Sequence, residues 1–223
     1  MYYVWFTFSE CKKRTVGYIE MLGTKITSIM DRIIKSKYNS MEALVEIFGT
    51  ISMEEIRIFL KRIMKAWETN EITQAAMYVS LKFIYMCLDQ PKIQIDFKNQ
   101  ILIPICYFSS FLLPSVFLLY SYLKTLSFAV ALFPLDKTEK HLREFLEKER
   151  PHMIIFTLSQ FLHVEALMKI VPYLHKRKLK VFIGGIPFIY EESLKGNFPN
   201  CYFPRDISEL GLMLQNFINE GKG

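Results

Sequence analysis

Up to about residue 90, apolar residues recur every three or four positions, which is the spacing of one buried face on a helix. This recurrence predicts four helices. One is expected over about 18–34 and one over 41–48, while the third opens after Ser52 and the fourth after Thr73. Four helices joined by short connections predict an antiparallel bundle.

Ser52 and Glu55 have the spacing of a capping box, in which each residue's side chain bonds the other's backbone N–H at the start of a helix. The third helix then carries a row of apolar residues on one face: Ile56, Phe59, Leu60, Ile63, Met64 and Trp67. The fourth helix carries Met77, Val79, Leu81, Ile84, Tyr85 and Leu88.

Beyond residue 100 the pattern changes, because short apolar runs alternate with longer amphipathic segments. Strands are predicted at 101–107, 128–134, 152–158 and 180–184, with a short one around 201–203, and helices at 112–126, 137–149, 162–176 and 206–220. Strands joined by helices form a parallel sheet. The predicted fold class is therefore α/β: a four-helix bundle over 1–90, a polar linker over 91–99, and a doubly wound, Rossmann-like (flavodoxin-like) domain over 100–223.

The uncharged stretch 101–123 is long and apolar enough for a membrane span. Pro104, Pro114 and the Ser109-Ser110 pair interrupt it, and strand-forming residues precede helix-forming ones. We favour a buried strand and a buried helix, since strands of a parallel sheet are apolar on both faces. A membrane-associated chain is the alternative.

Composition narrows the class further. The 223 residues are 51% hydrophobic, which excludes a disordered chain, and the net charge is +6. Basic clusters such as 175–178 are predicted to be solvated turns or helix ends, and no direct DNA-binding motif is present. The four cysteines are widely separated, and the N-terminus lacks the order of a signal peptide, so we expect free thiols and a cytoplasmic location.

The most informative stretch is 149–188, a strand, a loop with hydroxyl residues, a helix, and a strand that ends in two glycines. Ligands of parallel α/β sheets bind beyond the carboxyl ends of the strands. Thr157, Ser159, Gly184 and Gly185 are expected there. The hydroxyls would either bond a ligand or satisfy backbone at the strand end, and the glycines would let a flat ligand approach the backbone closely.

The order of these elements resembles cobalamin-binding modules, which occur in methionine synthases, corrinoid methyl carriers and light-sensing MerR-type regulators. The segment 67–75 is similar to the family's Trp-x-x-Gly-Glu-Ile-x-x-Ala motif, 150–159 to the strand before its Ser/Thr loop, and 180–185 to its Val-x-Val-Gly-Gly strand end. The resemblance implies that Trp67 covers the upper face of a corrin, although a tryptophan on an apolar helix face is more often a core residue. It also implies that Thr157, Ser159, Gly184 and Gly185 border the nucleotide tail.

The departures from the family fall on the cobalt ligands. The resemblance places Phe111 where the family has its cobalt-binding histidine, and a phenyl ring offers no lone pair to a metal. Met77 and Tyr78 stand where the regulators continue to a Glu-His pair. Cobalamin is therefore a candidate cofactor, but coordination by histidine is not expected, and another planar or apolar ligand is the other candidate.

No nucleophile, phosphate-loop or zinc motif is present, so we expect no catalytic residue, no metal ligands and no enzyme. We predict a sensory or regulatory module that binds a ligand, or a protein partner, between the bundle and the α/β domain. Trp67, Met77, Tyr78 and Phe111 would line that space or fill it. A regulatory partner or a homo-oligomer would complete the module. The alternative is a corrinoid protein that binds cobalamin without a protein histidine and serves methyl transfer.

Overall fold

The structure, a computed structural model, describes residues 52–89, 99–108, 113–135 and 139–220. The chain divides into two compact units, Met1–Gln94 and Ile95–Gly223, here called unit 1 and unit 2. Each unit is described by itself. The predicted helices at 18–34 and 41–48 and nearly all of the predicted linker lie outside the described residues.

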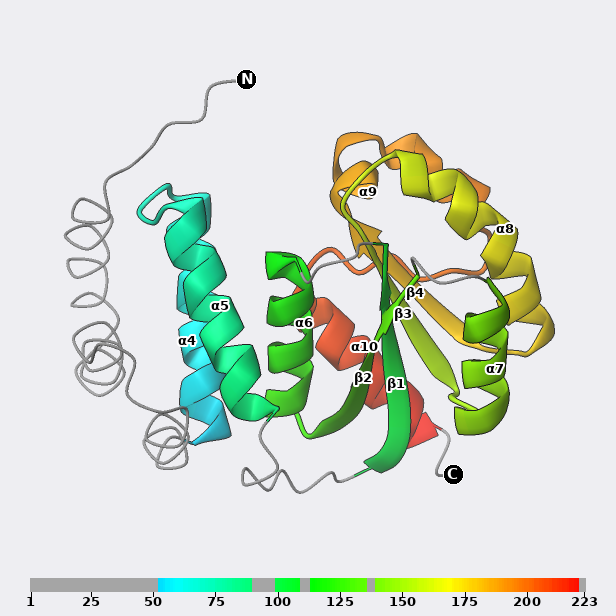
Figure 1. The fold of residues 1–223 in the computed structure, drawn as a ribbon, viewed down its shortest axis with the longest axis horizontal. Helices are drawn as coiled ribbons and strands as arrows, with labels where there is room; N and C mark the ends of the chain where they lie inside the picture. The colour runs from blue at the N-terminus through cyan, green and yellow to red at the C-terminus, as the bar shows by residue number, and fades with distance from the viewer. Residues whose placement is uncertain (1–51, 90–98, 109–112, 136–138, 221–223) are drawn as a thin grey trace. The chain divides into compact units, whose positions relative to one another are not determined.

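Unit 1 contains α4 (Met53–Glu68) and α5 (Gln74–Leu88), which pack against each other (Figure 1). The predicted capping box is confirmed: the Glu55 backbone N–H donates to Ser52 Oγ at 3.2 Å, and the Ser52 backbone N–H donates to the Glu55 carboxylate at 2.8 Å. One face of α4 is buried, and it consists of Ile56, Phe59, Leu60, Ile63 and Ala66.

Unit 2 is built on a parallel sheet of β1 (Asn99–Tyr107), β2 (Phe128–Pro134), β3 (Met153–Leu158) and β4 (Lys180–Gly185). The strands lie in the order β2-β1-β3-β4. The short strand predicted around 201–203 is reduced to a single parallel bridge between Tyr202 and Phe182. It is held by bonds of 2.9 Å from the Tyr202 N–H to the Val181 carbonyl and from the Ile183 N–H to the Tyr202 carbonyl.

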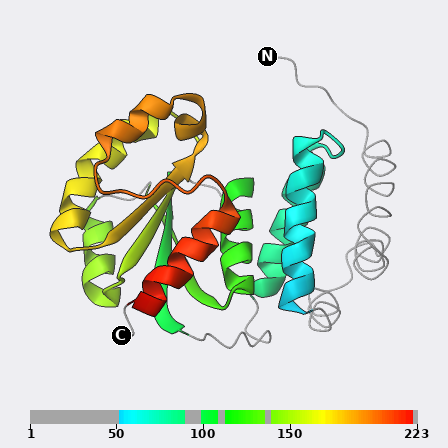
Figure 2. The same cartoon turned by 180° about the vertical axis from the view of Figure 1, so that it is seen from behind.

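Helices cover both faces of this sheet (Figures 1 and 2). On one face lie α6 (Pro114–Thr125) and α10 (Ile207–Glu220), and on the other α7 (Glu139–Glu149) and α8 (Leu162–Lys176). Alternate residues of β3, namely Ile154, Phe156 and Leu158, belong to a buried cluster with the apolar faces of α7 and α8. The predicted doubly wound parallel sheet is therefore confirmed.

The uncharged stretch 101–123 is shared between β1 and α6, with Pro114 in the first turn of the helix. Proline fits there because the first backbone N–H groups of a helix have no partner within it. Among the residues that the structure describes, no helix has the length and apolar character needed to cross a membrane.

The sequence pattern predicts no helix between residues 184 and 201, and the structure differs there. It forms a short helix α9 (Ile186–Tyr190) and a 3-10 helix η1 (Glu192–Asn197). Both are too short to show a helical period in the sequence. They are anchored by rings that contact one another, with centroids of Phe188 and Phe198 5.7 Å apart and of Phe188 and Phe203 5.2 Å apart.

We predict that Phe156→Ala lowers the free energy of unfolding by roughly 3–5 kcal/mol, because Phe156 is fully buried in the centre of β3. The matched control is Phe161→Ala, since Phe161 is half exposed and should cost well under half as much. Urea unfolding monitored by circular dichroism measures both. Equal losses for the two variants would contradict the described core.

Candidate functional site

The carboxyl ends of β1, β3 and β4 bring four of the predicted site residues close together. Thr157 pairs with Gly184 and Leu158 with Gly185 in the β3–β4 register, and Tyr107 of β1 pairs with Thr157 from the other side. Ser159 follows β3 directly. Neighbouring β1 and β3 are not consecutive in the chain, so the strand order reverses here, and such a switch point opens a crevice for ligands.

The two glycines differ in what surrounds them. A Cβ on Gly184 would meet nothing within 4 Å. A Cβ on Gly185 would lie 2.0 Å from the Leu158 carbonyl oxygen, and the φ of +119° at this residue is one that other residues rarely adopt. Gly185 is therefore a requirement of the fold, whereas Gly184 leaves open space at the strand end.

The hydroxyls of Thr157 and Ser159 are partly buried. No hydrogen bond ties either one to the described part of the chain. The two roles predicted from the sequence, bonding a ligand and satisfying backbone at the strand end, stay predictions. Both hydroxyls can donate to and accept from a ligand.

A pair of rings that no pattern in the sequence predicts lies at the switch point. Phe108, which follows β1, stacks on His163 in the first turn of α8, with ring centroids 4.8 Å apart and planes 13° apart. Buried Nδ1 of His163 has no hydrogen-bond partner among the residues that the structure describes. Burial lowers the pKa of His163 below its ordinary value. The one hint of this pair in the sequence was the position of His163, four residues after Ser159.

The predicted site residues of unit 1 lie on two helices. Trp67 is on α4 and is 38% exposed. Met77 on α5 is buried, and Tyr78 beside it is half-buried, with Lys82 Nζ 5.9 Å from its ring centroid. Phe111 lies outside the described residues. The prediction that these four residues share one space stays a prediction.

Thiol chemistry is unfavourable at the described cysteines. Burial raises the pKa of Cys87 to about 12 and of Cys201 to about 11, and it raises the pKa of Cys106 further still. All three are therefore protonated at neutral pH, and the thiolate is the reactive form. Within the described ranges, no three side chains of His, Cys, Asp or Glu gather as metal ligands.

Comparison by sequence identifies no relatives: no family model matches the chain, and no curated protein does. Comparison of structures finds proteins of similar fold. A novel cobalamin-binding protein from Desulfitobacterium hafniense DCB-2 is similar over 92% of this chain and 97% of its own, with 12% identity and a TM-score of 0.54.

A second similar structure is the methanol:cobalamin methyltransferase complex MtaBC from Methanosarcina barkeri. The similarity covers 96% of this chain and 81% of that chain, with 10% identity and a TM-score of 0.51. The chain thus has the fold of cobalamin-binding proteins, as its motifs predicted. At this identity the likeness concerns the fold alone.

The expectation that the chain is not an enzyme is wrong. That expectation rested on the missing catalytic motifs, but a chain of the methanol:cobalamin methyltransferase complex is similar in fold to this chain, at 10% identity. The absence of a local nucleophile or zinc motif therefore does not exclude an enzyme role.

We predict opposite effects of alanine at the two glycines. Gly185→Ala should destabilise unit 2 by more than about 1 kcal/mol, because its Cβ would overlap the Leu158 carbonyl and its φ is unfavourable. Gly184→Ala should be neutral or stabilise by up to about 1 kcal/mol, since glycine weakens a strand. Chemical denaturation measures both, and a large loss in Gly184→Ala would show that the open space is filled.

We also predict that His163 titrates below pH 6.5, its ordinary pKa, because burial disfavours the charged ring. The unfolded chain then takes up this proton at a higher pH than the folded chain, so stability falls as the pH drops through 6.5. NMR titration of the imidazole measures the pKa directly. His163→Phe keeps a stacked ring without the charge and should lose less stability between pH 7 and 5 than the unmodified chain. Equal losses would contradict the assignment.

Proposed function

We propose that this chain is a sensory or regulatory module that binds a flat, largely apolar ligand at the carboxyl end of the unit 2 sheet, with cobalamin as the first candidate. The observation that carries the proposal is Gly184, which leaves open space beside Thr157 at the end of two paired strands. A ligand can approach the backbone there as closely as van der Waals contact allows.

The surroundings of this strand end support an apolar ligand. The segments that directly follow β3 and β4 expose large apolar side chains: Phe161, Leu162, Ile186, Ile189 and Tyr190. Single exposed apolar residues are ordinary, but a group next to hydroxyl donors matches the composition of cofactor sites. Thr157 and Ser159 would orient polar groups of the ligand, while the apolar side chains would cover its flat part.

Cobalamin fits this arrangement as a carrier of chemistry that the chain itself lacks, because its corrin-bound cobalt forms and releases carbon–cobalt bonds. The residues of this strand end would hold and orient the cofactor. The space beside Gly184 admits a flat or extended group, and the hydroxyls of Thr157 and Ser159 would form hydrogen bonds with it. His163 remains neutral and stacked on Phe108, so its role is to shape the crevice at the switch point. Coordination of cobalt by a histidine of this chain is not part of the proposal.

A second candidate is a corrinoid protein that carries a methyl group between partners. The fold likeness to a methanol:cobalamin methyltransferase complex favours this role. In that case a separate enzyme subunit would cover the ligand during transfer. A sensor would instead change its assembly with a regulatory partner, or with a second copy of the chain, when the ligand binds.

We predict that the purified chain binds methylcobalamin or adenosylcobalamin and that Gly184→Ala lowers the affinity at least about tenfold without loss of stability. The added methyl group would occupy the space that the ligand uses. Gly196→Ala is the matched control, because its Cβ also meets nothing within 4 Å but lies in η1. Titration followed by visible absorption gives both affinities.

The same titration tests the mode of binding. Substitution of each of the four histidines by glutamine should leave the visible spectrum of the bound cofactor unchanged. A spectrum of histidine-bound cobalt that disappears in one of these variants would contradict the proposed mode. Absence of binding to any corrinoid, together with unaltered behaviour of Gly184→Ala, would refute the site.

Two measurements on the chain with bound cobalamin then distinguish a sensor from a methyl carrier. A ligand-dependent change in sedimentation, alone or with a partner, supports the sensor. Loss of the methyl group of bound methylcobalamin to an added thiol at a rate well above that of free methylcobalamin supports the carrier.

A further inference from the structure

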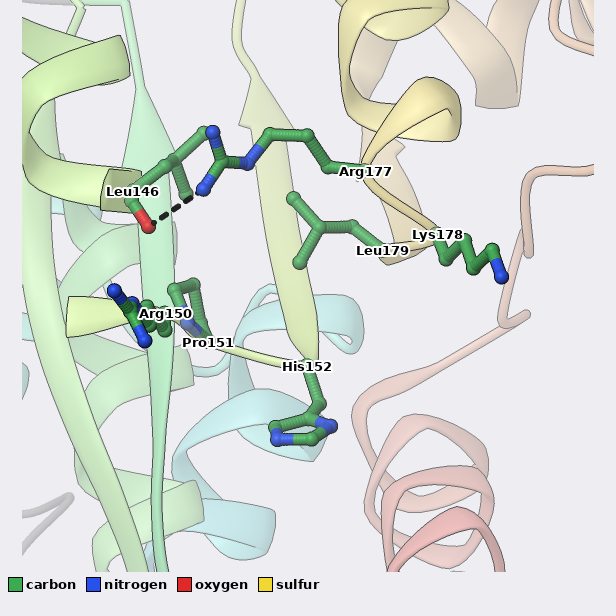
Figure 3. Close-up of a pocket in the computed structure, with 7 residues that line it drawn as sticks. All are labelled: Leu146, Arg150, Pro151, His152, Arg177, Lys178 and Leu179. Carbon is green, nitrogen blue, oxygen red and sulfur yellow. Dashed lines mark hydrogen bonds between the residues drawn. The ribbon is translucent and has the colours of Figure 1, made fainter. Parts of the chain in front are cut away.

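A cavity of about 340 Å³ lies at the opposite, amino-terminal end of β3 and β4. Its lining comes from the ends of α7 and α8 and the segments that lead into the two strands: Leu146, Arg150, Pro151, His152, Arg177, Lys178 and Leu179 (Figure 3). Three of these seven residues are permanent cations, and none is a carboxylate. The cavity belongs wholly to unit 2 and is separate from the strand end described above.

Arg177 is fixed in place by contacts on both sides. Its Nη2 donates to the Leu146 carbonyl at 3.3 Å, as the dashed line in Figure 3 shows, and its Nη1 donates to Tyr173 Oη at 3.1 Å. Its guanidinium also lies over the Tyr173 ring, 5.8 Å from the centroid. A guanidinium has five N–H donors in a rigid plane, so these contacts leave others for a ligand.

The side chains of Arg150, Lys178 and His152 have no hydrogen-bond or ion-pair partner among the described residues. The side chains of Arg150 and Lys178 are not needed to cap the ends of α7 and α8, because backbone N–H groups already bond the last carbonyls of these helices. The Arg150 N–H donates to the Leu146 carbonyl at 3.1 Å, and the Lys178 N–H donates to the His175 carbonyl at 2.9 Å.

Arg150 and Lys178 both occupy left-handed positions, with φ of 46° and 59°. Glycine would adopt these positions with less strain, and glycine is the usual residue just after a helix end. The long cationic side chains are therefore held at a conformational cost, which is the kind of cost found at functional positions.

Cations outnumber carboxylates in the lining of the cavity. The carboxyl ends of two helices contribute about half a negative charge each. The Glu147 carboxylate lies 3.8 Å from Arg177 Nη1 and offsets one cation. In Figure 3 the Lys178 side chain extends away from Arg177, so Arg150 and Arg177 are the two cations placed to meet an anion.

We propose that this cavity binds the phosphate group of a phosphorylated ligand. Arginine side chains match the geometry of phosphate oxygens, and Arg177 is already held in place beside the cavity. Arg150 contacts the phosphate from the α7 side, while Lys178 and His152 lie at the margin of the cavity. Buried Leu146, Pro151 and Leu179 form an apolar floor that accepts a ring or chain attached to the phosphate. The volume is at the small end of ligand sites, which suits a mononucleotide-sized compound.

The test compares adenosine monophosphate, inorganic phosphate and adenosine by isothermal titration of the full chain at low and at physiological ionic strength. We expect saturable binding of the monophosphate, weaker binding of inorganic phosphate, and none of adenosine. Arg150→Gln should weaken the monophosphate at least about tenfold, the effect of one charge-assisted contact. Lys176→Gln is the matched control, because Lys176 is an exposed cation in the same region that does not line the cavity.

Vesicles of phosphatidylcholine with and without phosphatidic acid distinguish a lipid phosphate from a soluble one. Arg150-dependent sedimentation with the acidic vesicles alone would assign the phosphate to a lipid and support the site. The proposal is overturned if no phosphate probe binds, or if Arg150→Gln binds as the unmodified chain does. It is also overturned if Lys176→Gln loses as much affinity, since that result indicates diffuse surface charge. Thermal unfolding of each variant verifies that it is folded.

Discussion

The pairing of β1 with β3 is the constraint on which unit 2 depends. Ile105, Cys106 and Tyr107 lie opposite Ile155, Phe156 and Thr157, and these two central strands are covered by helices on both faces. The chain passes from β1 to β2 on one side and must then cross to the other side of β1 to place β3. The loops after β1 and β3 consequently lead to helices on opposite faces of the sheet, and the strand ends between them are left open.

The strands were predictable because burial on both faces demands continuous apolar runs, and such runs are visible locally. The predicted strand 152–158 is β3, shortened by one residue at His152, and the helix predicted at 162–176 has the bounds observed. The stacking of Phe108 on His163 was not predictable, because its partners are far apart in the chain and neither has a periodic signature. The helices α9 and η1 were missed for a related reason: aromatic contacts with Phe198 and Phe203 stabilise them, not a helical repeat of their own.

The two ends of the sheet differ chemically, and helix direction explains why. Helices α7 and α8 return antiparallel to the strands, so their carboxyl ends gather at the amino-terminal edge of the sheet, where basic residues are favoured by the helix dipoles. The sequence could therefore assign the basic run 175–178 only to a solvated helix end. The fold adds what the run cannot show, namely that Arg177 and Lys178 share a cavity with Arg150 from a different helix. At the carboxyl-terminal edge the same strands present hydroxyls, glycines and apolar side chains instead.

Gly184 and Gly185 are adjacent, but the fold explains only one of them. Gly185 is explained by the chain alone, because any side chain there would overlap the Leu158 carbonyl. Gly184 is not explained in this way: its backbone has no left-handed requirement, and a Cβ would meet nothing within 4 Å. A glycine in a strand costs about 0.5–1 kcal/mol relative to alanine. Internal packing among the described residues does not account for that cost, and this is why the proposed ligand is placed beside Gly184 rather than beside Gly185.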